Sequence, residues 1–585
     1  MNRSHSQAPK AVTRAGWREW TGLAVLALAC LRYAMDLTVL HLAVPSLSAD
    51  LRPSSAQLLW IIDIYGFMVA GFLVTMGSLG DRIGRRRLLL LGAAAFGAVS
   101  VVVALSTSPE MLIGARALLG IAGAILAPST LSLIFSMFQD PRQRTTAIAI
   151  WITSFSAGGA IGPVLGGVLL EHFWWGSVFL LAVPVMALLL VLGPRVLPEF
   201  RAEDAGRLDL ASVAMLLLAV LAVVFGLKET AQSGISWLPV TSMLAGLVVA
   251  VVFVRRQLTL ADPMIDLGLF RIGAFNASLA TNLLGIFIAT GYFLFVAQYL
   301  QLVLGLSPLR AGLWSLPWAG GLIVGSNLAP WILRQVRPAL VIGAGLAMTA
   351  VGLAVLTKVG GSRDADLAIL AAASTVVSLG LGPVFTATTD LIVSSAPSER
   401  AGAASGISET GSELGGALGI AILGSIGVAV YRADLASSLP AGIPSQAAAA
   451  ARDTLGGAVG VARQLPDGAG AALLAGARDA FTTGLHVAAA ISAAVAVGVA
   501  VLATVTLRAE RASPQTQAEP CEQQPATAEP AAAAQLVRTG GGCVACPGER
   551  RHPDLQGTGR PELSIHDPKE AAVDLTEVIA DGSIG

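Results

Sequence analysis

The sequence predicts an all-α integral membrane protein, and two features of its composition indicate that class. Hydrophobic residues make up 55% of the 585-residue chain and charged residues only 13%, whereas about a quarter of the residues of a soluble domain are charged. The apolar residues gather in runs of about 20, the length that an α-helix needs to cross a bilayer. These runs lack the alternating pattern of barrel strands, so we expect a bundle of membrane-spanning helices.

Short polar turns such as STSPE and QDPRQRT separate the apolar runs and define about 14 expected spans. Residues 1–20 precede the first run, which is too long for the apolar part of a signal peptide, so we expect it to be retained as a span. The expected spans are 21–47, 58–80, 88–107, 110–136, 145–170, 174–193, 208–227, 239–255, 272–299, 309–333, 338–357, 366–392, 402–430 and 481–507.

Basic residues in the short loops predict the orientation, because cytoplasmic loops carry an excess of Lys and Arg. Most of them fall on the side of Arg82, namely Arg142, Arg144, Arg195, Arg201, Arg207, Arg255, Arg256, Arg271, Arg334, Arg337 and Arg400. The opposite loops are expected to hold Arg52, Lys228, Arg310, Lys358 and Arg363. We therefore expect a multi-pass protein of the cell membrane with both termini in the cytoplasm.

Two segments differ in composition from the spans. Residues 431–479 are rich in Ala and Gly and are expected to form a long external loop with room for short amphipathic helices. Residues 508–585 are rich in Pro, Gln, Glu and Ala, a composition typical of a disordered tail. Within the bundle, 328–346 repeats features of 77–97, which suggests two related halves, as in many transporters.

Ionisable residues inside the apolar runs are the candidate functional residues, because a charge there costs several kcal/mol unless it is paired or hydrated. Asp36 lies in the first run and Arg116 in the fourth. One interpretation is a permanent ion pair that fixes two helices. The other is a carboxylate that takes a proton on one side of the membrane and releases it on the other, under the field of an arginine that always stays charged.

Three further carboxylates lie in apolar surroundings. Glu409 and Glu413 are four residues apart and share a helix face, where they either line a water-filled vestibule or attract a cation and exchange protons. Asp63 lies between Trp60 and Tyr65, as either an interfacial residue beside an aromatic belt or an anion that binds a lipophilic cation together with the rings.

Other chemistries lack their motifs. None of the four lysines is followed by Ser or Thr, so there is no Walker motif, and neither HExxH nor GxSxG occurs. A single CxxC, at Cys543 and Cys546, falls in the expected tail and predicts no metal site. The formal net charge of zero gives no basic field for nucleic acid. We therefore expect no enzyme activity and no cofactor.

The stretch GSLGDRIGRRR (77–87), between the second and third expected spans, resembles the signature loop of the major facilitator superfamily. The resemblance implies that this loop is a conformational gate, formed by Gly77, Asp81, Arg82, Gly84, Arg85 and Arg86. LIGARALLG (112–120) is similar to the fourth-span motif of the same superfamily, whose arginine, here Arg116, is implicated in proton coupling.

Three more stretches resemble the 14-span drug:proton antiporter branch. SFSAGGAIGPVLGG (154–167) is similar to the fifth-span antiporter motif, with Ala149 at an upstream position where Gly is usual. MDLTVLHLAVP (35–45) and SETGSELGG (408–416) resemble the first-span and thirteenth-span motifs, with His41 where Asn is frequent. In the fifth span, small residues permit close helix packing and a proline permits a bend; these residues are Gly158, Gly162, Pro163, Gly166 and Gly167.

The resemblance, which is closest to QacA- and SmvA-type exporters, implies a major facilitator fold. Two six-helix halves, 21–193 and 272–507, would flank two inserted helices within 208–255. The implied activity is export of lipophilic, cationic drugs, dyes or biocides, driven by a proton gradient. Asp36 and Arg116 would couple protons, whereas Asp63, Glu409, Glu413, Tyr65 and Trp60 would bind the cation. Aromatic and amide residues of the ninth span would line the same cavity, namely Phe293, Phe295, Gln298 and Tyr299.

The expected partners are lipophilic cations, protons and membrane lipids, and the protein is expected to be monomeric. Two alternatives remain open. The first is a dedicated exporter of an endogenous metabolite or antibiotic that works by the same mechanism. The second is a membrane receptor that transports nothing, against which the buried carboxylates argue.

Overall fold

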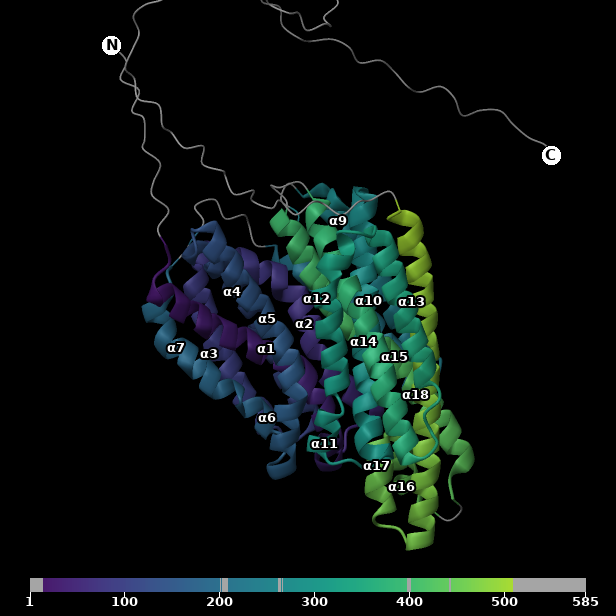
Figure 1. The fold of residues 1–585 in the computed structure, drawn as a ribbon. Coiled ribbons are helices and arrows are strands. Elements are labelled where there is room, and N and C mark those ends of the chain that lie inside the picture. Colours follow the sequence, from purple (N-terminus) through teal and green to yellow (C-terminus); the bar gives the residue numbers. More distant parts are fainter. Residues whose placement is uncertain are drawn as a thin grey trace, which may run out of the picture. The chain divides into compact units, whose positions relative to one another are not determined.

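A computed structural model describes residues 14–508, apart from 200, 202–208, 261–262, 264, 266, 397–400 and 441–442. The described residues form helices joined by turns and contain no strand (Figure 1), which confirms the all-α class. Nearly all of the expected tail, 508–585, lies outside the described residues.

The helices follow the expected order of apolar runs. Their bounds are α1 Trp17–Leu51, α2 Ser55–Ile83, α3 Arg85–Ala104, α4 Pro109–Met137, α5 Pro141–His172, α6 Ser177–Leu180, α7 Ala182–Val196, α8 Leu210–Ser233, α9 Trp237–Thr259, α10 Gly273–Gln298, α11 Pro308–Leu313, α12 Leu316–Leu333, α13 Pro338–Leu356, α14 Arg363–Ser394, α15 Ala401–Ser438, α16 Ser445–Asp453, α17 Leu455–Ala462 and α18 Asp467–Thr506. A 3₁₀ turn, η1 (Leu269–Arg271), precedes α10, and a π-helical turn, η2 (Tyr299–Val303), follows it.

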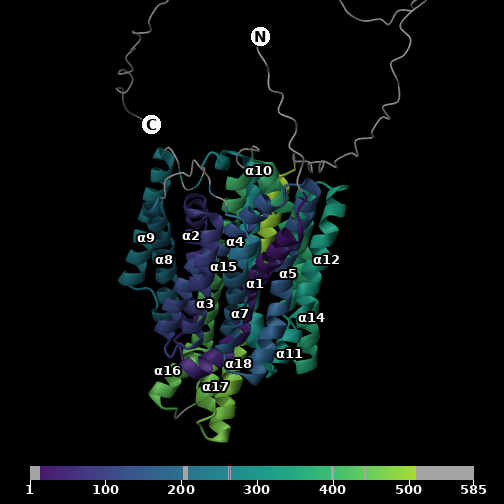
Figure 2. The same ribbon diagram turned by 90° about the vertical axis from the view of Figure 1, so that its left-hand side faces the viewer.

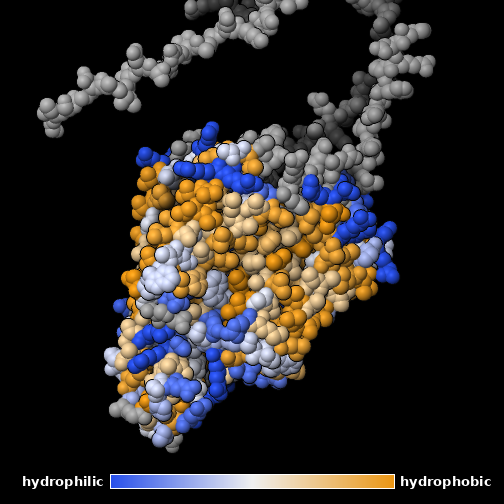
Figure 3. Space-filling view, turned by 180° about the vertical axis from the view of Figure 1, so that it is seen from behind, coloured by the Kyte–Doolittle hydropathy of each residue, from blue (hydrophilic) through white to orange (hydrophobic). Residues whose placement is uncertain are grey.

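Many of these helices are long and apolar enough to cross a membrane. Among the described residues there are twelve, or thirteen when the two parts of the bent helix α1 count as one span. Helix α12, which corresponds to the expected span 309–333, is not among them; its 18 residues include Asn327 and two prolines. The number fourteen therefore stays a prediction. A broad band of apolar side chains separates polar ends in the space-filling view (Figure 3), as expected for a surface in contact with lipid.

The helices pack in two groups, which we call the N-terminal helices (α1–α7) and the C-terminal helices (α10–α15 and α18). Between the groups, α2 packs against α15, α5 against α11, and α1 against α10. Helix α8 packs against α9, α2 and α15, so the helices of the expected insertion lie at one side of the bundle (Figure 2).

Helices α1 and α5 approach closely because three glycines of α5 face α1. A Cβ atom on Gly158 would lie 2.3 Å from the carbonyl oxygen of Leu31, and one on Gly162 would lie 2.4 Å from Thr38 Oγ1. At Gly166 the nearest atom, on Val39, would be 3.0 Å away. These contacts are the close helix packing that the spacing of small residues predicted.

The two groups also meet at the end of the bundle that carries α17, which we call the α17 end; the opposite end, at the start of α3, is the Arg85 end. Glu171 Oε2, on α5, accepts hydrogen bonds from Ser307 Oγ (3.1 Å) and from the Leu309 N–H (3.3 Å). Gln301 Nε2 donates to the carbonyl oxygen of Leu42 (3.0 Å). Gly312 of α11 faces α5, where its Cβ would lie 2.3 Å from the carbonyl oxygen of Pro163.

The segment expected as a long loop, 431–479, is mostly helical. Helix α15 continues to Ser438, α18 starts at Asp467, and α16 and α17 lie between them. With 40 residues, α18 is about 60 Å long, twice the thickness of a hydrocarbon core. The Ala-rich sequence of this segment favours helix outside the membrane as well as inside it, which hydropathy alone does not reveal.

Candidate functional site

A cavity of about 240 Å³ lies between the N-terminal and C-terminal helices. Residues of α1, α2, α4, α5, α10 and α15 line it, so its walls come from both groups. Its ionisable and polar lining residues are Tyr33, Asp36, His41, Asp63, Tyr65, Arg116, Thr290, Glu409, Ser412 and Glu413. Five ionisable residues that the sequence offered as separate candidates therefore meet at one cavity, whose remaining lining is mostly apolar.

Helix α1 bends by 44° between its parts Trp17–Asp36 and Thr38–Leu51. Thr38 Oγ1 donates a hydrogen bond to the carbonyl oxygen of Met35 (3.2 Å), and a side chain that enters the backbone ladder in this way bends a helix. Asp36 lies directly at this bend. His41, on the other side of the bend, lines the same cavity as Asp36.

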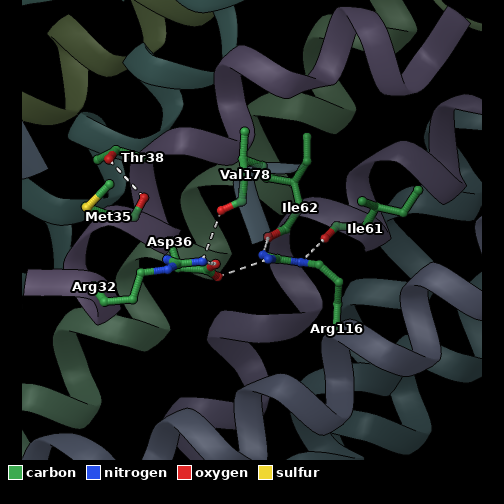
Figure 4. Close-up of polar contacts among 8 residues, drawn as sticks. All are labelled: Arg32, Met35, Asp36, Thr38, Ile61, Ile62, Arg116 and Val178. Atoms are coloured by element: carbon green, nitrogen blue, oxygen red, sulfur yellow. Dashed lines mark hydrogen bonds and ion pairs between the residues drawn. The ribbon is translucent and has the colours of Figure 1, made fainter. Parts of the chain in front are cut away.

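Asp36 lies between two arginines (Figure 4). Arg116 Nη1 is 3.1 Å from Asp36 Oδ2, and Arg32 Nη2 is 3.1 Å from Asp36 Oδ1. All three side chains are at most 3% exposed. Arg32 was not among the residues predicted from the sequence, although its position four residues before Asp36 on the same helix was a usable signal.

Arg116 also joins α4 to α2. Its Nε donates to the carbonyl oxygen of Ile61 (2.8 Å) and its Nη2 to that of Ile62 (3.3 Å), and the guanidinium lies 5.0 Å from the centre of the Tyr65 ring. One guanidinium thus contacts the Asp36 carboxylate and the backbone directly before Asp63, because its donors point in several fixed directions.

Asp63 pairs with a lysine that the sequence placed in an external loop. Lys228 Nζ lies 2.9 Å from Asp63 Oδ1 and 2.7 Å from Oδ2, and 3.7 Å from the centre of the Trp60 ring. Both charged side chains are at most 1% exposed. The expected loop position of Lys228 is therefore wrong, because α8 continues to Ser233 and buries it. The interfacial interpretation of Asp63 is also wrong, since this carboxylate is buried inside the protein, between Lys228 and the central cavity.

Glu409 and Glu413 are half-buried at the cavity wall on α15. Tyr33 Oη donates a 2.6 Å hydrogen bond to Glu413 Oε1, across the boundary between the two groups of helices. Among the residues that the structure describes, no basic side chain forms an ion pair with either glutamate. Within the described part of the chain, these two carboxylates therefore line the cavity without a directly paired basic side chain.

The expected lining residues of the ninth span lie elsewhere. Phe295 and Gln298 line a separate cavity of about 50 Å³. Tyr299 is buried and donates a hydrogen bond to Asp366 (2.7 Å), while Phe293 stacks on His41 with ring centres 6.2 Å apart. The prediction of their position was wrong because the apolar α10 offers no sequence signal for the face that points to the cavity.

The loop that resembles a gate is tied to the segment after α7. Arg86 Nη1 donates to the carbonyl oxygen of Leu197 (3.0 Å), and Arg86 Nε lies 3.4 Å from Glu199 Oε2. Gly84 has a φ of +109° and faces Glu199, so a side chain there would be strained and would clash. Glu199 was not predicted from the sequence because it is separated from the loop by more than 100 residues. The Asp81 side chain lies outside the described residues.

The remaining residues of this loop and of the α5 motif differ in how closely they are packed. A Cβ on Gly77 would make normal contact with Pro128 of α4, at 3.9 Å. Arg82 is half-buried near the end of α2, and Arg85 is the first residue of α3. Gly167 faces α11, where its Cβ would lie 2.7 Å from the carbonyl oxygen of Pro308.

No group of three or more His, Cys, Asp or Glu residues within the described part of the chain could hold a metal ion. The CxxC stretch falls in the part that is not described.

Comparison with known proteins gives a family and a fold. The family described as Major Facilitator Superfamily matches residues 26–420. The chain is 44% identical over 496 residues to the multidrug efflux pump LfrA of Mycolicibacterium smegmatis, covering 85% of this chain and 98% of the relative. It is 36% identical over 469 residues to the methyl viologen resistance protein SmvA of Salmonella typhimurium, covering 80% and 93%.

Among solved structures, a bacterial homolog of the human lysosomal transporter Spinster, in an inward-facing and unoccupied conformation, aligns with a TM-score of 0.61. It is 18% identical and covers 86% of this chain and all of its own. This similarity supports the fold.

Proposed function

Because the chain belongs to the Major Facilitator Superfamily, we propose that it exports lipophilic cations across the cell membrane in exchange for protons. The observation that carries the proposal is the cavity between the two groups of helices, where apolar walls surround several carboxylates. Charge pairing with an anion and contact with apolar or aromatic walls together favour a lipophilic cation over a metal ion or a sugar. The names of the relatives, which refer to multidrug efflux and to methyl viologen, agree with this class of substrate.

In this proposal Asp36 carries the exchanged proton. Ionised, it pairs with Arg32 and Arg116, which hold it from two sides, and offsets one of their two positive charges. Protonated, it would release both arginines, whose buried charges would then favour a different arrangement of α1 against α4. The bend of α1 at Asp36 makes this helix the natural element to respond. Arg116 is the positioning residue, since its guanidinium also holds the backbone of α2.

Glu413 and Glu409 attract the cation in this proposal. They lack a basic partner among the described residues, and the Tyr33 hydroxyl that binds Glu413 comes from the opposite group of helices. A bound cation would therefore change a contact between the two groups. That is the kind of differential contact through which a ligand shifts a conformational equilibrium.

The two groups rock about the cavity in the proposed cycle. Contacts at the α17 end, including those of Glu171 with Ser307 and Leu309, support a state that is closed there. The excess of basic loops at the Arg85 end supports a cytoplasmic location for that end and for both termini. Arg86 and Glu199 would hold the Arg85 end of the N-terminal helices as one body during the movement. We propose that a monomer in contact with membrane lipids completes the cycle.

The test is transport by the purified full-length chain in liposomes with an imposed proton gradient, with ethidium and internal pH followed together. Opposite fluxes of dye and protons that a protonophore abolishes are the expected result. Absence of movement for every lipophilic cation tried, with folded protein, would refute the proposal. A dedicated metabolite exporter with the same mechanism would then be the next hypothesis.

A further inference from the structure

The side chains of Asp63 and Trp60 form a site suited to an ammonium ion. A carboxylate supplies charge and two acceptor oxygens, and an indole face attracts a cation through its quadrupole. The occupant of this site is the protein's own Lys228, with its Nζ 2.7–2.9 Å from the carboxylate oxygens and 3.7 Å from the ring centre. The combination of a fully buried carboxylate and an aromatic face is the same chemistry that would recognise a lipophilic cation.

The Asp63 carboxylate has neighbours on two sides. It contacts Lys228 on the side of α8, and it also lines the central cavity that contains Glu413. Arg116, which holds Asp36, donates to the backbone carbonyl of Ile62, the residue before Asp63. A cation that enters the cavity therefore meets Asp63 as a carboxylate already neutralised by a lysine, unlike Glu409 and Glu413.

We propose that Lys228 is a tethered competitor of the transported cation: its ammonium group occupies the Asp63–Trp60 site while the cavity is empty, and a lipophilic cation that reaches Asp63 displaces it. The inference rests on the proposed function and deepens it, because it assigns the inserted helix α8 a part in substrate affinity. A competitor fixed to the chain lowers the affinity for the transported cation, and a lower affinity favours release of the cation from an exporter. The strength of Lys228's hold on Asp63 then sets which cations are exported.

Removal of the Lys228 ammonium group should raise the affinity for the cation. Lys228→Met keeps an apolar stem of similar length but leaves Asp63 available to a cation in the cavity. At an effective dielectric of about 20, an additional unpaired carboxylate about 12 Å from a bound charge strengthens binding by about tenfold, and a nearer one strengthens it more. The gain requires Asp63, so it is absent from the double variant Lys228→Met/Asp63→Asn.

A side chain that binds Asp63 more strongly than lysine should lower the affinity for the cation. Lys228→Arg keeps the positive charge, so the carboxylate stays paired and the bundle keeps its buried neutral pair. A guanidinium can hold a carboxylate with two parallel hydrogen bonds, where an ammonium acts as a point charge. Cation affinity is therefore expected to fall in this variant.

The experiment is equilibrium binding of tetraphenylphosphonium to the full-length chain in lipid nanodiscs, at one pH and one salt concentration. It compares the unmodified protein, the three variants above and Lys358→Met. The last variant is the matched control, because it removes an exposed lysine outside the bundle core. The expected order of affinity is Lys228→Met above the unmodified protein and Lys358→Met, with Lys228→Arg lowest.

Several results would overturn the inference. They are unchanged affinity in Lys228→Met, a gain that persists without the Asp63 carboxylate, and unchanged affinity in Lys228→Arg. If Lys228→Met does not fold, the Lys228→Arg result decides, since that variant keeps the pair. If the unmodified protein binds tetraphenylphosphonium but the variants do not show the expected differences in affinity, the inference alone is refuted. If the unmodified protein does not bind it, the proposed function is refuted and the inference with it.

Discussion

Two adjacent glycines of α5 give a sharp test of the contact with α1. A Cβ atom at Gly158 would lie 2.3 Å from the carbonyl oxygen of Leu31 and 2.9 Å from Ala34 Cβ, whereas one at Gly159 would meet no atom within 4 Å. Both changes to alanine raise helix propensity by the same amount, about 1 kcal/mol. The difference between the two variants therefore isolates the packing of α5 against α1.

Gly158→Ala needs the two helices to move apart by about 1 Å, because an ordinary contact of Cβ with oxygen is above 3 Å. Such overpacking costs about 1–3 kcal/mol. The displaced part of α1 carries Arg32 and leads to Asp36, and 3.1 Å contacts lengthened by 1 Å are no longer hydrogen bonds. We expect Gly158→Ala to lower the free energy of unfolding by about 1–3 kcal/mol relative to Gly159→Ala, and to reduce proton-driven dye efflux at least roughly tenfold.

Both quantities are measurable on the same preparations, by denaturant unfolding in detergent and by ethidium efflux from liposomes. Gly159→Ala should match the unmodified protein in efflux and equal or exceed it in stability. Equal stability and equal efflux for the two variants would show that α1 and α5 are not in close contact. The role of these glycines in packing α5 against α1 would then be refuted.

Three further predictions concern the α17 end and the cavity. Gly312→Ala should open the α17 end, because its Cβ would lie 2.3 Å from the carbonyl oxygen of Pro163. Gly320→Ala is the control, since its Cβ would meet no atom within 4 Å. Labelling of engineered cysteines at the α17 end measures the opening, and equal labelling of the two variants would contradict the prediction. Asp36→Asn should abolish uphill transport while the protein remains folded in the membrane, because an amide carries no negative charge to pair with the two buried arginines. Efflux that is still driven by a proton gradient would refute the role assigned to Asp36. Glu413→Gln should weaken binding of dications such as methyl viologen more than that of monocations, since the attraction scales with ligand charge; equal losses would indicate proton coupling instead.

The membrane-spanning helices were largely predictable because each one is specified by its own apolar run. Hydropathy fails at the ends: α15 continues past the expected span 402–430 to Ser438, and α18 starts at Asp467, well before the expected span 481–507. There the chain is rich in alanine, which favours helix regardless of the solvent, so no change of composition indicates where the bilayer stops.

The site was predictable as a set of residues but not as an arrangement. Charges inside apolar runs are conspicuous, so Asp36 and Arg116 could be selected individually, although their contact depends on how α1 and α4 pack. Lys228 was misplaced because it is followed by polar residues and looks like the start of a loop. Only the buried partner, Asp63 on a different helix, explains why α8 continues past it. Arg32 was recoverable from the spacing of four to Asp36.

The burial of Lys228 limits how this fold can be shortened. Helices α8 and α9 lie at the side of the bundle, which makes them look removable in a minimal twelve-helix transporter. Without α8, however, Asp63 would lose its counter-ion and face lipid, where a lone charge is among the most unfavourable groups a helix can present. Helix α2 and the inserted pair are therefore interdependent: the insertion can be deleted only together with the Asp63 carboxylate, for instance by its replacement with leucine. A deletion that leaves α2 unchanged should fail at membrane insertion and folding, before transport is ever tested.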